Sequence, residues 1–495
     1  MSSTKKLLLA IFLLGLLLRC INLEGRSIQY DDAFSFFLAS QNPTAIIKGT
    51  AADTMPPLYY FLLHFWMLLS QQLWFLRLLS ILLSMASVGL VFLITQRLLG
   101  SSAGLFAAFL AAISPFQVYH AQDLRMYALL CLGQAGYTYF FIRFWQNSQE
   151  DEITRWYEWT GLILCGTIAV YSHNLAVFVL VVPDIYLVLQ RKWKILSHLL
   201  AAQVVIGLLA LPWLWLVPGQ IAKIQKAFWT PRPGLVEIIQ AVIMFTATLP
   251  LPGFWLLVGA ILSLWVLIII IIETWRNRNQ SSGLPLLIAF TLLPPILLFI
   301  ASYVMRPVFV PRAFIFSSLM YNGVAGWVIS KSWPKGVSHL VVIGFVIAAL
   351  IALPYQQYFT DFPRSSFKEM ATDLRLKIDH QPGSIVIHDN KLSYFPTRFF
   401  APDLPQKFLA DEPGSSNDTL ALASQQAMQT FPEQSLQTAI QGYREVYFVV
   451  FSETIEEYKR SGLSNHPQLD WLQRNMEEKS VFNKNDLEIY EFSPR

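Results

Sequence analysis

Two adjacent carboxylates, Asp31 and Asp32, occupy the motif Tyr-Asp-Asp-Ala-Phe at the start of a short helix-like stretch. Neighbouring side chains point in different directions on a helix, so the two acids cannot form a close acid/base pair. One can face a substrate as a general base while the other positions it or binds a cation. The alternative is a helix N-cap, a position that Asp favours. Because a cap accounts for only one of the acids, we expect a chemical role for the pair.

A third acid, Asp123, is followed by Arg125 two residues later. An acid near a membrane boundary is often only an exposed loop residue, and this is the alternative here. A carboxylate beside arginines nevertheless suits glycosyl transfer. The carboxylate can take the proton of an acceptor hydroxyl as that oxygen attacks the anomeric carbon of a sugar. Arginines can bind a lipid phosphate and neutralise the charge that builds on it as it leaves.

Three histidines, His64, His120 and His173, could add a metal centre to these acids. Their spacing matches no metal-ligand motif. Lone histidines on apolar helices more often pack with hydrogen bonds than bind metal. No cofactor is therefore expected with certainty, and a requirement for a divalent cation stays open.

The elements that position these residues belong to a membrane protein. Of the 495 residues, 54% are hydrophobic and 14% are charged, which excludes an ordinary soluble protein. The first 353 residues carry 22 basic and 12 acidic side chains, and the last 142 carry 14 and 20. We predict a multi-span transmembrane catalytic domain over residues 1–353 and a soluble domain over residues 354–495. The basic residues form no stripe, so no nucleic-acid partner is expected.

The charges of the loops predict the topology. Lys5 and Lys6 place the start of the first span in the cytoplasm, which puts residues 22–74 outside. The apolar residues 56–70 are too few for a crossing, so we interpret them as a helix along the outer membrane surface. Residues 237–250 likewise predict a surface or re-entrant helix. Alternation then gives about eleven spans with the tail outside. The basic residues of the cytoplasmic loops are Arg97, Arg143, Arg155, Arg191, Lys192, Lys194, Arg276, Arg278, Lys331 and Lys335.

Six cations fall on the outer side against this trend. Contact with lipid headgroups or snorkelling explains any single one of them. Six such cations on the side that carries Asp31 and Asp123 favour a binding site for an anion. They are Arg26, Lys48, Arg77, Arg125, Arg306 and Arg312.

The tail has the pattern of a small α/β domain. Residues 367–378 and 453–461 predict helices, and residues 384–388 and 444–451 predict buried strands. Strands that alternate with helices indicate a mixed fold. The tail contains no glycine-rich phosphate loop and no nucleophile elbow, so the candidate chemistry stays with the membrane part and its first external loop.

Several short motifs, taken in their order along the chain, resemble one known family. The family is that of the polytopic GT-C glycosyltransferases of the protein O-mannosyltransferase and aminoarabinose-transferase type, glycosyltransferase family 39, and the bacterial branch that modifies core glycans is the most similar. The motifs cover about 300 residues, and the ordered set is more specific than any one motif. They are Tyr30-Asp31-Asp32, Pro56-Pro57-Leu58-Tyr59-Tyr60, Leu76-Arg77-Leu78-Leu79-Ser80, Gln122-Asp123-Leu124-Arg125-Met126-Tyr127, Tyr171-Ser172-His173-Asn174 and Pro311-Arg312.

The resemblance implies roles for these residues. The family usually has Asp-Glu where this chain has Asp31-Asp32, and its first acid is taken as the base. By that match Asp31 is the base and Asp32 the supporting acid, although the departure at the second position leaves the choice between them open. Asp123 matches the second external acid. Arg77 matches an arginine thought to approach the donor phosphate, and Arg312 resembles an outer-face arginine near the lipid-linked donor. With Arg125 and Arg306 from the outer-side cations, they are the expected donor-phosphate-binding residues. The expected substrate contacts are Tyr30, His64, Tyr127 and His173.

The resemblance also implies a fold and an activity. We expect a GT-C membrane body with horizontal helices in its first external loop and an extracytoplasmic α/β domain. The expected activity is inverting transfer of a hexosyl or pentosyl unit from a polyprenyl-phosphate donor to a glycan, lipid or protein acceptor. We expect the reaction at the outer face of the plasma membrane, with membrane lipids around the protein. A flippase or transporter of lipid-linked saccharide is the main alternative, and a membrane scaffold is another. The sugar, the acceptor and the oligomeric state are left open.

Overall fold

The computed structural model describes residues 3–149, 155–226, 230, 232–305, 307–333, 336–379, 383–412 and 418–495. These residues form two compact units. The first comprises Met1–Leu23 and Thr50–Gln357, and the second comprises Glu24–Gly49 and Tyr358–Arg495. The second unit thus combines the tail with a segment of the first external loop, which a single division at residue 354 does not include.

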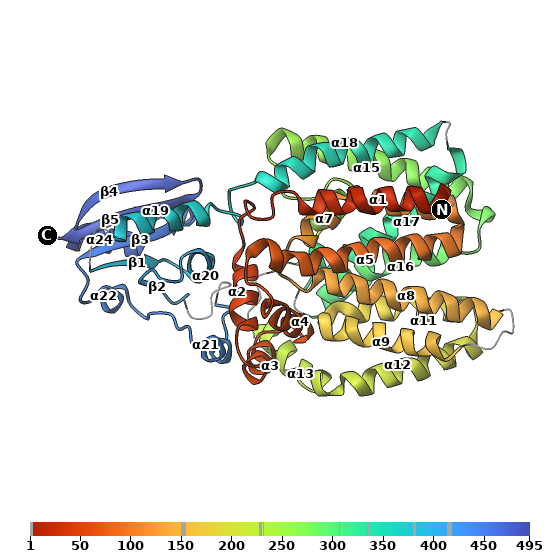
Figure 1. Ribbon diagram of the computed structural model, residues 1–495, viewed down its shortest axis with the longest axis horizontal. Coiled ribbons are helices and arrows are strands. Elements are labelled where there is room, and N and C mark those ends of the chain that lie inside the picture. The colour runs from red at the N-terminus through yellow and green to blue at the C-terminus, as the bar shows by residue number, and fades with distance from the viewer. Residues whose placement is uncertain are drawn as a thin grey trace. The chain divides into compact units, whose positions relative to one another are not determined.

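The first unit is a bundle of long helices, many of them side by side (Figure 1). Among the described residues, six helices are long and apolar enough to cross a membrane, or seven when the bent pair α6 (Ser101–Ile113) and α7 (Pro115–Ala121) is counted as one span. The expected multi-span helical membrane fold is confirmed. The six are α5 (Leu73–Leu99), α12 (Trp193–Leu214), α15 (Gly253–Arg276), α16 (Leu284–Val304), η3 with α17 (Pro311–Ser332) and α18 (Val337–Tyr358).

Other helices occupy positions where spans were predicted. α1 (Ser3–Cys20) carries Lys5, Lys6 and Arg19, which makes it less apolar than the six. α8 (Tyr127–Gln149) and α9 (Trp156–Ser172) follow, and α9 has only 17 residues. Residues 174–189 are divided among η1 (Asn174–Ala176), α10 (Val177–Leu180) and α11 (Val182–Leu189). The count of eleven spans therefore stays a prediction.

Two short apolar helices match the expected surface helices. They are α4 (Leu58–Met67) and α14 (Leu235–Thr246), of 10 and 12 residues. Both are too short to cross a bilayer, which needs about 20 apolar residues. α7 bends by 57° from α6 at Ser114 and Pro115. Proline cannot donate a backbone hydrogen bond, so it ends α6 and begins α7 at its first turn.

Polar contacts between neighbouring segments occur at both ends of the bundle. At one end, Arg97 donates to Gln146 (2.8 Å) and Arg143 pairs with Glu158 (2.8 Å). At the other end, Asn174 donates to the carbonyl of Thr54 (2.8 Å). One end of the bundle thus carries Arg97 and Arg143, two of the basic residues predicted to share a side of the membrane. The side of the membrane that each end faces stays a prediction.

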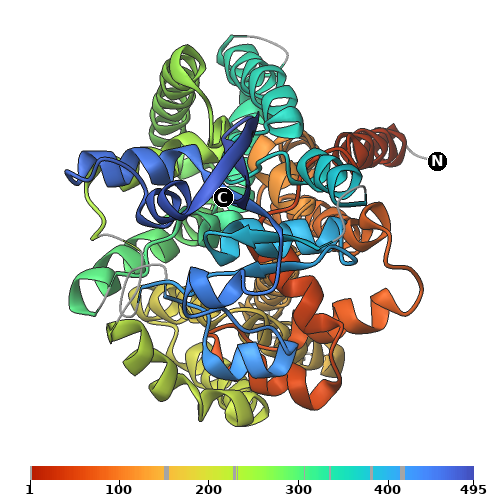
Figure 2. The ribbon, with the colours of Figure 1, turned by 90° about the vertical axis from the view of Figure 1, so that its left-hand side faces the viewer.

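The described residues of the second unit form a five-stranded mixed sheet with the order β2-β1-β3-β5-β4 (Figure 2). β1 (Ser384–His388) pairs in parallel with β2 (Gln406–Phe408) and β3 (Glu445–Phe451), whereas β5 (Leu487–Pro494) runs antiparallel to β3 and β4 (Met476–Lys484). Successive residues of β1 and β3 enter two different cores, because neighbouring side chains of a strand face opposite sides. The expected small α/β domain is confirmed.

Helices cover this sheet and join the segment Glu24–Gly49 to it. α19 (Phe367–Asp379) and α23 (Ser452–Arg460) agree with the two predicted helices. α24 (Pro467–Asn475) precedes β4. α20 (Lys391–Phe400) follows β1, and α2 (Tyr30–Ala39) packs against it. α3 (Pro43–Ala52) continues the segment, and α21 (Leu422–Met428) also contacts α2.

Candidate active site

The turn from α7 to α8 places Asp123 inside the first unit. His120, on α7, lies with its Nδ1 2.8 Å from Oδ2 of Asp123. Both side chains are buried, with 5% of each residue exposed. Asp123 is therefore not an exposed loop residue, and the imidazole fixes the direction in which its carboxylate points. The bend between α6 and α7 is what brings this pair to the end of the bundle.

Two tyrosines of α4 connect the Pro-Pro-Leu-Tyr-Tyr motif to the arginines. The hydroxyl of Tyr60 accepts a hydrogen bond from Nη1 of Arg125 at 3.3 Å, and the residues are 0% and 6% exposed. The hydroxyl of Tyr59 lies 3.0 Å from Oγ of Ser80 on α5. Ser80 is one helical turn from Arg77, which is fully buried and donates to the carbonyl of Leu23. α4 thus contacts Arg125 directly through Tyr60 and, through Tyr59, the turn of α5 next to Arg77.

Tyr127 lies between the remaining residues of this end. Its ring centroid is 5.6 Å from the guanidinium carbon of Arg312, which lies on η3 (Pro311–Phe314). The same ring is 5.4 Å from the ring of His120 and 6.2 Å from that of His173. A cation over an aromatic face is attracted by the negative face of the ring. Three residues predicted to bind donor or substrate, Tyr127, His173 and Arg312, are therefore brought together.

His173 lies in the turn between α9 and η1 and is held neutral. Burial, followed by the positive charges of Arg312 and Arg125, lowers its pKa to about 3. Its Nδ1 accepts a hydrogen bond from the backbone N–H of Leu175 at 3.1 Å, so the single proton of the neutral ring lies on Nε2. The charges of both guanidinium groups therefore oppose protonation of this imidazole. The cluster is electropositive and offers one additional uncharged donor.

Other predicted residues lie elsewhere. His64 is half-buried on α4, with its ring 5.3 Å from that of Phe65. Arg306 lies outside the described residues. Tyr30, Asp31 and Asp32 belong to the second unit, as do Arg26 and Lys48.

Asp32 and Asp31 take part in different hydrogen bonds of α2. Oδ2 of Asp32 accepts a hydrogen bond from the backbone N–H of Gln29 at 2.9 Å, and Asp32 is 2% exposed. Asp32 thus serves the N-terminus of α2 as its third residue, whereas the alternative in the sequence was the N-cap itself, which is Gln29. Asp31 is half-buried, and its backbone carbonyl accepts a hydrogen bond from Ser35. The carboxylate of Asp32 is committed to the start of α2.

Arg19 and Gln122 are positioning residues that the sequence analysis missed. Arg19 is fully buried and donates to the carbonyls of Ala111 and Ala112, at 3.1 and 2.9 Å, and to Oγ of Ser84. These carbonyls lie at the C-terminus of α6, where the bend removes their helical partners. Gln122 donates to the carbonyl of Arg19 at 2.9 Å. The signal in the sequence was a lone arginine at the end of an apolar span.

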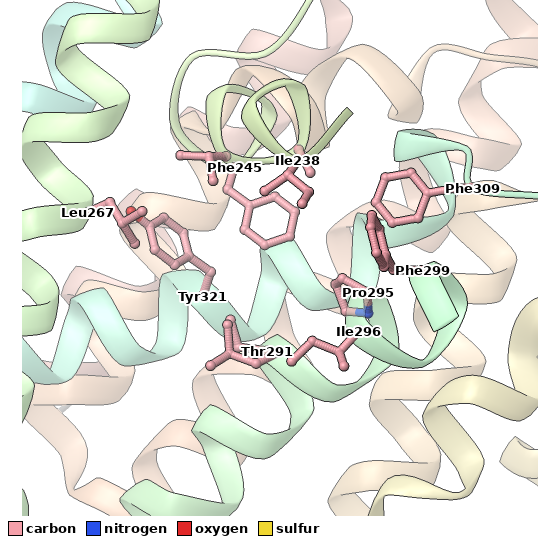
Figure 3. A pocket seen from close by; sticks show the side chains of 12 residues that line it. Ile238, Phe245, Leu267, Thr291, Pro295, Ile296, Phe299, Phe309 and Tyr321 are labelled. Carbon is pink, nitrogen blue, oxygen red and sulfur yellow. The ribbon is translucent and has the colours of Figure 1, made fainter. Parts of the chain in front are cut away.

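An apolar cavity of about 310 Å³ lies between α14, α15, α16 and α17 (Figure 3). Thr291 and Tyr321 are its only residues with polar side-chain groups. Phe309, which lines it, is three residues before Arg312, and its ring lies 4.9 Å from that of Phe314 on η3. The remaining lining residues are Ile238, Ala241, Val242, Phe245, Leu267, Leu292, Pro295, Ile296 and Phe299. The described part of the chain contains no group of three or more His, Cys, Asp or Glu side chains placed to hold a metal ion.

Comparisons with known proteins agree with this architecture. Residues 54–216 match the family model described as dolichyl-phosphate-mannose-protein mannosyltransferase. This range contains Arg77, Asp123 and His173, whereas Asp31 and Arg312 lie outside it. No curated protein matches the chain.

Solved structures share the fold over nearly the whole chain. ArnT from Cupriavidus metallidurans bound to undecaprenyl phosphate is 12% identical, with a TM-score of 0.65 over 99% of this chain and 98% of that one. Apo ArnT gives a TM-score of 0.64 at the same identity and coverage. The Archaeoglobus fulgidus oligosaccharyltransferase tethered to an acceptor peptide is 13% identical, with a TM-score of 0.56 over 99% of this chain and 74% of that one.

The fold and the family match together define the class of this protein. It is a multi-span membrane protein with the GT-C glycosyltransferase fold, and residues 54–216 match the mannosyltransferase family model named above. The resemblance drawn from the ordered motifs is confirmed.

Proposed function

We propose that this protein transfers a sugar from a polyprenyl-phosphate donor to an acceptor hydroxyl, with inversion, at the outer face of the plasma membrane. One observation carries the proposal: the ring of Tyr127 lies 5.6 Å from the guanidinium carbon of Arg312 and 6.2 Å from the ring of the buried His173, at the end of the bundle where Arg125 donates to Tyr60. Such a site is complementary to a phosphate, because two guanidinium groups supply charge and the imidazole supplies a donor. The membrane body gives a lipid-borne donor lateral access.

The apolar cavity supports a lipid-linked donor. It contains no charged residue, and Phe309 connects it along the chain to Arg312. A phosphate bound by the arginines would leave an apolar tail to be accommodated among the helices. ArnT, which shares the fold, has been solved with undecaprenyl phosphate bound. We infer the same class of carrier lipid for this chain.

The chemical step follows from the roles of these groups. Asp31 accepts the proton of the acceptor hydroxyl as its oxygen attacks the anomeric carbon from the face opposite the phosphate. The bond from the anomeric carbon to the phosphate oxygen breaks, and the polyprenyl phosphate leaves with the electron pair. Arg77, Arg125 and Arg312 neutralise the developing charge. A single displacement of this kind inverts the anomeric configuration.

Asp123 and Asp32 have supporting roles in this scheme. The hydrogen bond from His120 orients the carboxylate of Asp123 beside the arginine cluster. Asp123 thereby becomes the second acid of the site, suited to holding a sugar hydroxyl or an arginine in place. Asp32 holds the first turn of α2, which carries Asp31. The base is therefore assigned to Asp31.

Transfer from a radiolabelled donor tests the proposal. Purified protein in liposomes is incubated with undecaprenyl-phosphate sugars, each tested with and without an envelope-glycan acceptor fraction. We expect donor consumption with release of undecaprenyl phosphate only when acceptor is present. Movement of intact donor across the bilayer without consumption would replace the transferase by a flippase. Mass spectrometry of the acceptor then identifies the sugar as a hexose, pentose or amino sugar.

A further inference from the structure

The segment Glu24–Gly49, which carries the Tyr-Asp-Asp motif, folds with the C-terminal domain as one compact unit. It is separated from that domain in the sequence by the whole helical bundle. Contacts between the segment and the domain occur at its beginning, along α2 and at its end. Their distribution over the segment indicates that the domain sets the conformation of the backbone that carries Asp31.

The beginning of the segment is held by buried hydrogen bonds. Nη1 of Arg364 donates to the carbonyl of Ser27 at 2.9 Å, and Oγ of Ser27 donates to the carbonyl of Ser365 at 2.6 Å. Arg364 is 1% exposed and Ser27 is 8% exposed. Buried hydrogen bonds with a charged donor are among the stronger ones in proteins. The chain is therefore held three residues before Tyr30.

Aromatic packing between α2 and α20 holds the middle of the segment (Figure 1). The ring of Phe395 lies edge-on to Tyr30 at 5.4 Å and packs against Phe37 at 5.8 Å. The ring of Phe399 lies edge-on to Phe36 at 4.8 Å. Residues four apart share one face of a helix, so α20 presents a stripe of side chains to α2. Edge-to-face pairs at these distances are favourable and directional.

Lys391 connects this stripe to the sheet. It begins α20 shortly after the end of β1, forms an ion pair with Asp411 and is 2% exposed. Its ammonium group lies 6.0 Å from the centroid of the Tyr30 ring. The ring of Tyr30 therefore lies between the ammonium group of Lys391 and the ring of Phe395. At the other end of the segment, Ser424 donates to the carbonyl of Gly49 at 3.1 Å.

Gly49 is required at this last contact. A Cβ atom there would come within 2.6 Å of Cδ1 of Leu38 and 3.4 Å of Cβ of Ala427 on α21. The close approach of the two backbones thus depends on the absence of a side chain.

We propose that the soluble domain is the positioning element for the catalytic base: the α20 stripe of Lys391, Phe395 and Phe399 holds α2 and so sets the direction of Asp31. The catalytic part of this proposal rests on the proposed function, whereas the anchoring does not. The three stripe residues act through Tyr30, Phe36 and Phe37 and touch no substrate in this scheme. Asp31 then moves with the soluble domain as part of one body.

Hydrogen exchange of the full-length protein in detergent tests the anchoring without reference to activity. We expect Phe395→Ala to raise the exchange rate of the α2 amides at least tenfold and to leave α5 unchanged. The matched control is Phe400→Ala, on the same helix, because Phe400 packs against the domain's own core. Phe399→Ala is a milder second variant, should Phe395→Ala unfold the domain. Unchanged exchange in α2 for both stripe variants would overturn the anchoring.

Steady-state kinetics test the consequence for the reaction. Because the arginines that bind the donor belong to the other unit, we expect Phe395→Ala to lower kcat at least tenfold with donor KM changed less than threefold. Phe395→Leu, which restores most of the apolar volume, should recover most of kcat. A loosened α2 with unchanged kcat would overturn the positioning role. Should the wild-type protein transfer no sugar, the proposed function fails alone, and the exchange data still decide the anchoring.

Discussion

The charged residues of the helical bundle and those of the Tyr-Asp-Asp segment are held in different ways. In the bundle, guanidinium groups contact backbone carbonyls, a phenol and an aromatic face, as the buried Arg19 and Arg125 and the half-buried Arg312 illustrate. In the segment, the acids lie on a short helix that packs through aromatic rings onto an α/β domain. The arginines proposed to bind phosphate thus belong to the helical bundle, whereas the proposed base belongs to the second unit.

The largest expected effect separates the two acids of the segment. Asp31→Asn removes the group that accepts the proton, and general-base catalysis typically contributes about 10²–10⁴-fold. We expect kcat to fall by about that factor with donor KM nearly unchanged, in the radiolabelled-donor assay. Near-normal turnover by this variant would reject the assigned base.

Substitution of the bundle arginines should have the opposite kinetic signature. Arg125→Met or Arg312→Met removes a charged hydrogen-bond donor, worth about 10- to 100-fold in affinity. We expect donor KM to rise by that factor in each variant. Arg278→Met is the matched control, because Arg278 lies at the other end of the bundle on the exposed face of Trp275. An equal loss in the control would contradict a phosphate site at Arg125 and Arg312.

Arg19→Met tests how the bundle maintains its bend. The substitution leaves the carbonyls of Ala111 and Ala112 without this donor in a buried place, which costs about 1–3 kcal/mol per unsatisfied group. We expect a lower thermal midpoint in detergent, and partial recovery in Arg19→Lys, which keeps the charge but not the planar fork. A midpoint equal to that of the wild type would show that the bend does not depend on Arg19.

The pH dependence of stability tests the neutral state of His173. Its pKa is about 3 in the folded protein and about 6.5 as an ordinary value, so the folded state binds fewer protons between these limits. Stability should therefore be complete above pH 6.5 and should fall as the pH decreases toward 3. The thermal midpoints of the wild type and His173→Gln should differ most at pH 7 and should approach each other as the pH is lowered to 4. Parallel curves would contradict the assigned state.

The smallest effect is expected at Asp32. Asp32→Ala removes the hydrogen bond to Gln29 at the start of α2, a loss of about 0.5–2 kcal/mol for a helix cap. We expect kcat to fall less than tenfold, through a less ordered first turn, and Asp32→Glu to recover part of it. A loss as large as that of Asp31→Asn would transfer the role of base to Asp32 and remove the contrast between the two acids.

Much of the architecture could be predicted because it depends on local patterns. Apolar runs located the long helices, and the short apolar runs at residues 56–70 and 237–250 located the short helices α4 and α14, whose position at the membrane surface stays a prediction. Alternating patterns in the tail located β1 and β3. The bend between α6 and α7 was missed, because an apolar run that contains one proline has the same composition whether it is straight or broken.

The candidate site was predictable in its residue types but not in its contacts. Asp123, Arg125, Tyr127 and His173 were expected on one side, and the structure brings them together at one end of the bundle. The link from Tyr60 to Arg125 was not expected, since it joins α4 to the turn between α7 and α8, 65 positions away. No local pattern specifies such a pair.

The sequence by itself determined the class of the protein, the helical membrane body and the mixed tail, and it supplied the candidate residues for a phosphate site. These follow from composition, periodicity and charge, which act within a few residues of one another. Only the tertiary structure decided that Asp32 serves its own helix, that Arg19 holds the end of α6, and that residues 24–49 belong with the tail. The last contact joins Ser27 to Arg364 across 337 positions, and such a pairing depends on the packing of the whole chain.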